Sequence, residues 1–146
     1  MLRKKFILYL LLAYPSFGFS QWYTPEKVNK KAGILYAQAY DAAQDQQYEV
    51  AIAKINQAIK LEPTFVDAFL SRAGIYANLK KYDSSVIDFE KAFELDAVYA
   101  KDYLLPYSIS LAGTGKFPKA LDAVNKFLTN DKLNTQSIKA GHYRKS

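Results

Sequence analysis

The sequence contains no cysteine, one histidine, six glycines and five prolines among its 146 residues. Without cysteine, disulfide bonds, thiolate nucleophiles and cysteine-ligated metal sites are excluded. The single His142 lies in a basic tail with no catalytic partner beside it, and we expect it to be solvated. The scarcity of glycine and proline favours long helices over many short strands. A hydrophobic content of 50% is sufficient for one packed domain.

The excess of positive charge is small, and much of it lies at the amino terminus. The net charge is +6, and residues 1–20 contain three basic and no acidic side chains, so the remaining chain carries +3. No arginine-rich face or basic stripe accompanies this charge, and we therefore expect no nucleic-acid partner.

Acidic residues show no metal-binding pattern. They lack the loop spacing of a calcium site, and the sequence predicts no metal and no cofactor. We expect these residues to lie on solvated helix faces: Asp41, Asp45, Asp83, Asp88 and Glu90.

The segment Gly113-Thr114-Gly115-Lys116 only superficially resembles a phosphate-binding loop. That loop requires a glycine at position 110, where Ser110 stands, and a hydroxyl residue after the lysine, where Phe117 stands. A turn between helices explains the segment better. With no nucleophile, base or phosphate loop recognised, the sequence predicts a protein that is not an enzyme.

The first twenty residues have the pattern of a secretory signal peptide. A cationic start at residues 3–5 precedes the apolar run 6–13, Pro15 interrupts it, and small residues follow. We expect cleavage between Ser20 and Gln21. The alternative is an uncleaved membrane anchor, but the run is shorter than the roughly 20 residues that a span needs.

Export follows from that signal. We expect a location in the periplasm or at the outer membrane, or secretion, with no membrane span after cleavage. Without a cysteine the chain cannot be an acylated lipoprotein. Residues 21–29 form a lead-in to the folded part.

One amphipathic pattern occurs three times along the chain. Its apolar positions follow the spacing i, i+3, i+4, i+7, i+10, i+11, and it recurs after 34 and then 35 residues, with Ser85 the only residue of the eighteen that is not apolar. The three sets are Tyr48, Ala51, Ile52, Ile55, Ala58 and Ile59; Tyr82, Ser85, Val86, Phe89, Ala92 and Phe93; and Phe117, Ala120, Leu121, Val124, Phe127 and Leu128.

Each of these helices follows another with its own apolar face, so the sequence predicts helix pairs at about 30–62, 65–96 and 99–129. Turn and cap residues agree with this division. Pro63 ends the first pair, and Thr64 with Asp67 forms a helix start. Gly113 and Gly115 mark the turn inside the third pair, and Pro118 suits the first turn of the helix that follows.

These features resemble the tetratricopeptide repeat family, which places small residues where paired helices cross and an aromatic near the start of the second helix. The aromatics are Tyr48, Tyr82 and Phe117, and the small crossing residues are Ala39, Ala51, Ala73, Ser85, Ala92, Ser108 and Ala120. Small side chains there allow close approach of the helices. The resemblance implies an all-α fold, a right-handed superhelix of three antiparallel helix pairs. Three units lie within 30–132, at about 32–65, 66–99 and 101–133.

Residues 133–146 are predicted to form a short additional helix. Asn134 or Thr135 could cap it, and Ile138 and Tyr143 could pack under the third repeat. It is either a capping helix or the start of a longer array. The chain is also similar to the front of exported Bacteroidota envelope proteins, in which such repeats precede a WD40-like propeller and an outer-membrane protein A type domain.

The resemblance places a binding groove on the first helices of the pairs. The corresponding residues are Gly33, Tyr36, Tyr40, Ala43 and Gln44 in repeat one, Asp67, Leu70, Gly74, Ala77 and Asn78 in repeat two, and Asp102, Leu105, Ile109, Ala112 and Gly113 in repeat three. Tyr36 and Tyr40 replace the residues that clamp a terminal carboxylate in chaperone-binding relatives, so we expect no such clamp. Tyr36, Tyr40, Leu70 and Ile109 either anchor a partner or pack internally, and both interpretations stay open.

The leading functional hypothesis is a non-catalytic scaffold that binds a protein or peptide in the cell envelope. The alternative is an amino-terminal positioning module of a larger peptidoglycan- or outer-membrane-associated protein. A small-ligand carrier or enzyme is a third hypothesis, and a carrier would require a closed apolar pocket.

Overall fold

The computed structural model describes residues 28–143, and the side chains of residues 28–130. Within these residues every regular element is a helix, which confirms the expected all-α fold class. The elements are α2 (Lys30–Gln44), α3 (Tyr48–Leu61), α4 (Val66–Asn78), α5 (Tyr82–Leu95), α6 (Ala97–Ala100), the 3-10 helix η1 (Lys101–Tyr103), α7 (Leu104–Gly113) and α8 (Phe117–Tyr143). The predicted signal peptide, its Ser20–Gln21 cleavage site and the side chain of His142 lie outside the described residues.

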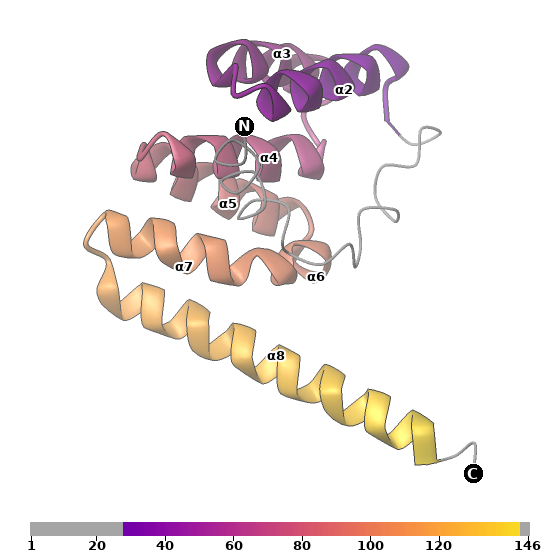
Figure 1. Ribbon diagram of the computed structural model, residues 1–146, viewed down its shortest axis with the longest axis vertical. Coiled ribbons are helices and arrows are strands. Elements are labelled where there is room, and N and C mark those ends of the chain that lie inside the picture. The colour runs from indigo at the N-terminus through magenta and orange to yellow at the C-terminus, as the bar shows by residue number, and fades with distance from the viewer. Residues whose placement is uncertain (1–27, 144–146) are drawn as a thin grey trace, which may run out of the picture.

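The helices stack as successive antiparallel pairs. Figure 1 shows α2 with α3, then α4 with α5, then α7 with α8, arranged one below another along the longest axis. These pairs match the predicted repeats, so each repeat contributes one layer of the stack.

The turn inside each pair has the same backbone geometry. It places one residue in the left-handed region, at 34- and 35-residue intervals: Gln46 (φ 60°), Lys80 (φ 57°) and Gly115 (φ 77°). In each turn the next amide donates back across the end of the helix: Gln47 to Ala42, Lys81 to Tyr76 and Lys116 to Leu111. These bonds satisfy carbonyls that the helix end leaves open. The repeat therefore extends from side-chain pattern to backbone conformation.

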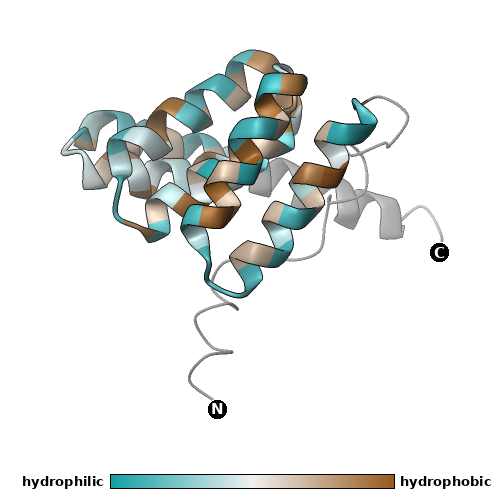
Figure 2. Ribbon diagram, turned by 90° about the horizontal axis from the view of Figure 1, so that it is seen from above, coloured by the Kyte–Doolittle hydropathy of each residue, from teal (hydrophilic) through white to brown (hydrophobic). Residues whose placement is uncertain are grey.

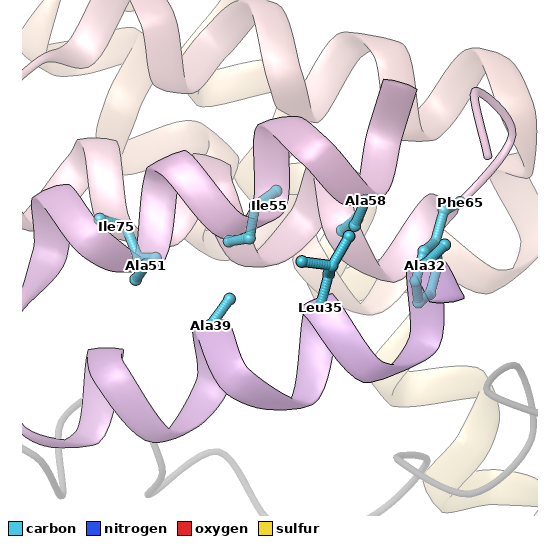
Figure 3. Packing of buried hydrophobic residues seen from close by; sticks show 9 residues of the cluster. Ala32, Leu35, Ala39, Ala51, Ile55, Ala58, Phe65 and Ile75 are labelled. Atoms are coloured by element: carbon cyan, nitrogen blue, oxygen red, sulfur yellow. The ribbon is translucent and has the colours of Figure 1, made fainter. Parts of the chain in front are cut away.

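Small residues allow the paired helices to pack closely. In Figure 3 Leu35 and Ala39 of α2 point toward the helix that carries Ala51, Ile55 and Ala58. Ala39, Ala51 and Ala58 are almost completely buried, so a larger side chain would force the helices apart. Polar and apolar segments alternate along the coloured helices of Figure 2, as an amphipathic element requires.

At the second crossing, Ser85 replaces the alanine of the first repeat and forms buried hydrogen bonds. Its hydroxyl donates to the Ala73 carbonyl oxygen at 2.8 Å and lies 2.8 Å from the Ser110 hydroxyl. The only polar residue of the predicted apolar pattern therefore connects α4, α5 and α7.

An arginine of the second repeat joins three helices. The Arg72 guanidinium donates two hydrogen bonds of 2.7 Å to the Asp88 carboxylate and a third to Asn56. It also lies 5.6 Å from the centre of the Phe69 ring. Asp88 is 3% exposed, so its prediction as a solvated residue is wrong. Its contact with Arg72 removes it from solvent.

Two helix starts differ from expectation. α4 begins at Val66 without a side-chain cap, and the Thr64 hydroxyl donates to Glu62 instead of capping the helix. The first helix of the third pair is divided into α6, η1 and α7. Pro106 explains this division, because it has no N–H for the carbonyl of Asp102, and its ring crowds that carbonyl in an α-helix.

The prediction of a separate helix at residues 133–146 is wrong. α8 runs without interruption from Phe117 to Tyr143, and Figure 1 shows it extending beyond the stack. No glycine or proline lies between Pro118 and Gly141, so no residue favours a break near Asn134 or Thr135. Those two positions lie inside the helix and do not cap it.

Candidate binding groove

The predicted groove residues lie on α2, α4 and α7 and on the segment that leads into α7. The structure divides them by exposure. Gly33, Asp67 and Leu70 are buried; Tyr36, Ala43, Gln44, Gly74, Ala77 and Leu105 are partly buried; Tyr40, Asn78, Asp102, Ile109, Ala112 and Gly113 are exposed.

Two of the proposed anchors belong to the packed interior. The Tyr36 hydroxyl lies 2.8 Å from the Ser71 hydroxyl, and its ring centre lies 4.9 Å from that of Phe65. Burial raises the pKa of the Tyr36 phenol far above its ordinary value. Leu70 is 3% exposed and packs with Phe69. Tyr36 therefore joins α2 to α4, and Leu70 contributes to the core of the second repeat.

The other two proposed anchors are exposed. Tyr40 is 45% and Ile109 56% exposed. Two exposed apolar side chains therefore lie at equivalent positions of repeats one and three, with Gly74 at the equivalent position of repeat two.

Asp67 occupies the first turn of α4 and is 7% exposed. Its Oδ1 accepts a 2.6 Å hydrogen bond from the Tyr99 hydroxyl, whereas Oδ2 is buried without a hydrogen-bond partner among the described residues. Burial raises the pKa of the Asp67 carboxyl, and the Tyr99 hydrogen bond offsets part of that rise. Asp67 was predicted to be a groove residue, but its hydrogen bond with Tyr99 of α6 was not predicted.

Two further tyrosines near the groove were missed by the sequence analysis. Burial raises the pKa of Tyr103 to about 12, with a further contribution from the negative charge of Asp67. The Tyr107 hydroxyl donates to Glu90 at 2.9 Å, and its ring packs on Phe93 of α5 with centres 5.1 Å apart. The sequence feature that could have identified them is the concentration of tyrosines in residues 99–107, at the start of the third pair.

Gly113 has a packing function. A Cβ atom placed on Gly113 would lie 2.4 Å from ring atoms of Tyr82, so the end of α7 rests directly on the aromatic that opens α5. Its assignment to the groove is therefore incomplete, because glycine is needed here for contact between repeats.

No metal site emerges from the described residues. They contain no cluster of three potential metal ligands, and none of their helices is long and apolar enough to cross a membrane. A shallow hollow of about 390 Å³ is lined by Leu104, Asn125, Lys126, Thr129 and Asn130. This hollow is open to solvent, so it is not the enclosed pocket that a small-ligand carrier requires.

Comparison with known proteins supports the repeat assignment. Residues 66–99 match a family model described as tetratricopeptide repeat. The chain is 36% identical over 98 residues to small glutamine-rich tetratricopeptide repeat-containing protein 2 of Saccharomyces cerevisiae. That match covers 67% of this chain and 28% of the yeast protein.

Solved structures show the same fold. The crystal structure of MamA superposes with a TM-score of 0.67 at 17% identity, over 73% of this chain and 61% of MamA. The first TPR of Spaghetti (RPAP3), bound to the HSP90 peptide SRMEEVD, gives a TM-score of 0.65 at 19% identity. That match covers 78% of this chain and 97% of the RPAP3 domain.

Proposed function

Because this chain is a tetratricopeptide repeat protein, we propose that it is a non-catalytic scaffold that binds a peptide or a partner domain on the face formed by α2, α4 and α7. The observation that carries the proposal is the exposure of Tyr40 and Ile109 at equivalent positions of repeats one and three. The RPAP3 domain, whose structure contains a bound peptide, supports this use of the fold by analogy.

A peptide-array experiment tests the proposal. The chain is applied to an array of random heptapeptides, and affinities for the strongest binders are measured by fluorescence anisotropy. We expect Tyr40→Ala and Ile109→Ala each to weaken binding by about tenfold, because exposed large side chains at an interface centre carry most of the binding energy. Matched controls are Val50→Ala on α3 and Ile87→Ala on α5, whose side chains are 47% and 65% exposed.

The controls should stay within about twofold of the wild-type affinity. Equal losses for all four variants would contradict a binding face on α2, α4 and α7. Circular dichroism of each variant distinguishes lost binding from lost folding.

We also propose that the chain is exported to the periplasm or outer membrane. The support is the cationic start and apolar run of residues 1–20. Expression with a carboxy-terminal tag, fractionation and amino-terminal sequencing test it. A product that begins at Gln21 in the envelope or periplasmic fraction is expected, and a product that begins at Met1 in the cytosolic fraction would contradict export.

The alternative function is that of a positioning module in a larger envelope protein. The chain spans 28% of the yeast relative, so similar repeats form part of a longer protein there. The open reading frame around the coding sequence, read in the genome, decides between the two. A fused peptidoglycan-binding domain would favour the module.

A further inference from the structure

The carboxyl group of Asp67 is only partly satisfied. Oδ1 is held by Tyr99 at 2.6 Å, while Oδ2 has no hydrogen bond to any described residue although the side chain is 7% exposed. A buried carboxylate oxygen without a donor is costly. Native proteins rarely retain one without a role.

One tyrosine contacts this carboxyl, and its negative charge acts on two others from different elements. Tyr99 of α6 is hydrogen-bonded to it, and the charge of Asp67 raises the pKa of Tyr36 on α2 and of Tyr103 in η1. Aromatic ring faces attract cations, and tyrosine hydroxyls can accept hydrogen bonds from them. A carboxylate among tyrosines is therefore suited to an ammonium or guanidinium group.

We propose that Asp67, with Tyr36, Tyr99 and Tyr103, forms a subsite for a cationic group of the bound peptide. The cation is a lysine or arginine side chain, or a free amino terminus, and its N–H donates to Oδ2 while Tyr99 holds Oδ1 in place. This subsite rests on the proposed function, because it lies on the same face as Tyr40 and Ile109. It adds the chemical class of the ligand.

Oδ2 is buried, so a neighbouring side chain must move to admit the cation. Tyr103 is suited to this movement. Its hydroxyl forms no hydrogen bond with the described residues, and it lies at the end of the 3-10 turn η1, where backbone hydrogen bonding is weaker than in an α-helix. An acidic peptide such as SRMEEVD would instead bring carboxylates toward an unpaired carboxylate oxygen.

The heptapeptide array tests the subsite directly, with every peptide printed in free and amino-terminally acetylated forms. Wild-type binders should be enriched in lysine and arginine and depleted of aspartate and glutamate. Asp67→Asn should weaken the strongest basic binders by about tenfold or more, since a hydrogen bond to a charged group is worth that much. Binders without a cationic group should stay within about twofold. Asp83→Asn, which changes an exposed acid in the first turn of α5 outside the groove by the same charge, is the matched control and should have a much smaller effect.

The outcomes separate the subsite from the groove. Loss of binding on acetylation would identify the amino terminus as the cation, and unchanged binding would identify a side chain; both support the subsite. Binders that depend on Tyr40 and Ile109 but show no basic enrichment, or no loss with Asp67→Asn, overturn the subsite and leave the groove standing. If no peptide binds in a way that depends on Tyr40 or Ile109, the proposed function is overturned and the subsite with it.

Discussion

At the scale of single residues, the buried Asp67 carboxyl has a defined effect on stability. Its pKa is raised in the folded state, so folding favours the protonated form. The contribution of Asp67 to the free energy of unfolding is therefore fully present at pH values below the ordinary carboxyl pKa. That contribution is lost as the pH rises through the raised pKa.

Asp67→Asn should consequently raise the melting temperature at pH 7 by a few degrees, because the amide removes the buried charge and can still accept from Tyr99. The gain should vanish near pH 3, where the wild-type carboxyl is protonated. Thermal unfolding followed by circular dichroism from pH 3 to 8 measures it, with Asp102→Asn as control. A lower melting temperature at neutral pH would show that the ionised carboxylate stabilises the fold.

Gly113 provides a second test at the residue scale. Alanine is the better helix former, yet its Cβ would lie 2.4 Å from the Tyr82 ring. We expect Gly113→Ala to lower the free energy of unfolding by about 1–3 kcal/mol. In a Tyr82→Ala background the same change should be neutral or stabilising. A urea-unfolding double-mutant cycle measures this, and equal costs in both backgrounds would exclude the ring contact as the cause.

Charged residues were the ones that sequence reasoning placed least well. Asp88 was predicted on a solvated face and is buried against Arg72. The two residues lie sixteen positions apart on different helices, so only the packing of α4 on α5 brings them together. Asp67 was placed on the groove face by repeat register, but its burial depends on Tyr99 from the irregular segment before α7, which the repeat pattern does not describe.

At the scale of elements, the turn inside each pair is a repeated feature with different residues at the left-handed position. Gly115 (φ 77°) adopts it freely, and no atom lies within 4 Å of a Cβ placed there. Lys80 adopts the same region (φ 57°), where a side chain other than glycine is strained by about 1 kcal/mol.

Opposite substitutions should therefore have opposite effects. Gly115→Ala should lower the free energy of unfolding by about 1 kcal/mol, and Lys80→Gly should raise it by about 0.5 kcal/mol, because the relief of strain exceeds the entropy that glycine adds to the unfolded chain. Urea unfolding measures both. Lys81→Gly, at φ −85°, is the control and should destabilise; a stabilising Lys81→Gly would refute the backbone explanation.

Element order and pairing were predictable because one amphipathic pattern recurs with little variation. The predicted turn at Gly113 and Gly115 and the position of Pro118 in the first turn of α8 are confirmed. The continuity of α8 was not predicted, because Asn134 or Thr135 was interpreted as the cap of a new helix although no helix-breaking residue lies between Pro118 and these positions.

At the scale of the whole molecule, the array has one inter-repeat face that the described residues leave open. On α5, Val86 is 2% exposed and packs in a cluster with Leu111 of α7. Thirty-five residues further, the equivalent Leu121 of α8 is 62% exposed. Along the same face of α8, Phe117 is 66% and Leu128 47% exposed.

The two equivalent positions should respond differently to truncation. Val86→Ala should cost about 2 kcal/mol of unfolding free energy, because it leaves a cavity between repeats, whereas Leu121→Ala should cost less than about 0.5 kcal/mol. Urea denaturation of the two variants at low protein concentration measures this. A large cost for Leu121→Ala would mean that its side chain is covered in solution.

The central claim is that the face formed by α2, α4 and α7 binds the ligand. The most direct measurement is amide chemical-shift mapping by NMR, with a peptide from the array titrated into the isotope-labelled chain. The account predicts that the largest shifts fall on α2, α4 and α7, around Tyr40, Asp67 and Ile109. Shifts concentrated on α3, α5 or the open face of α8 would contradict it.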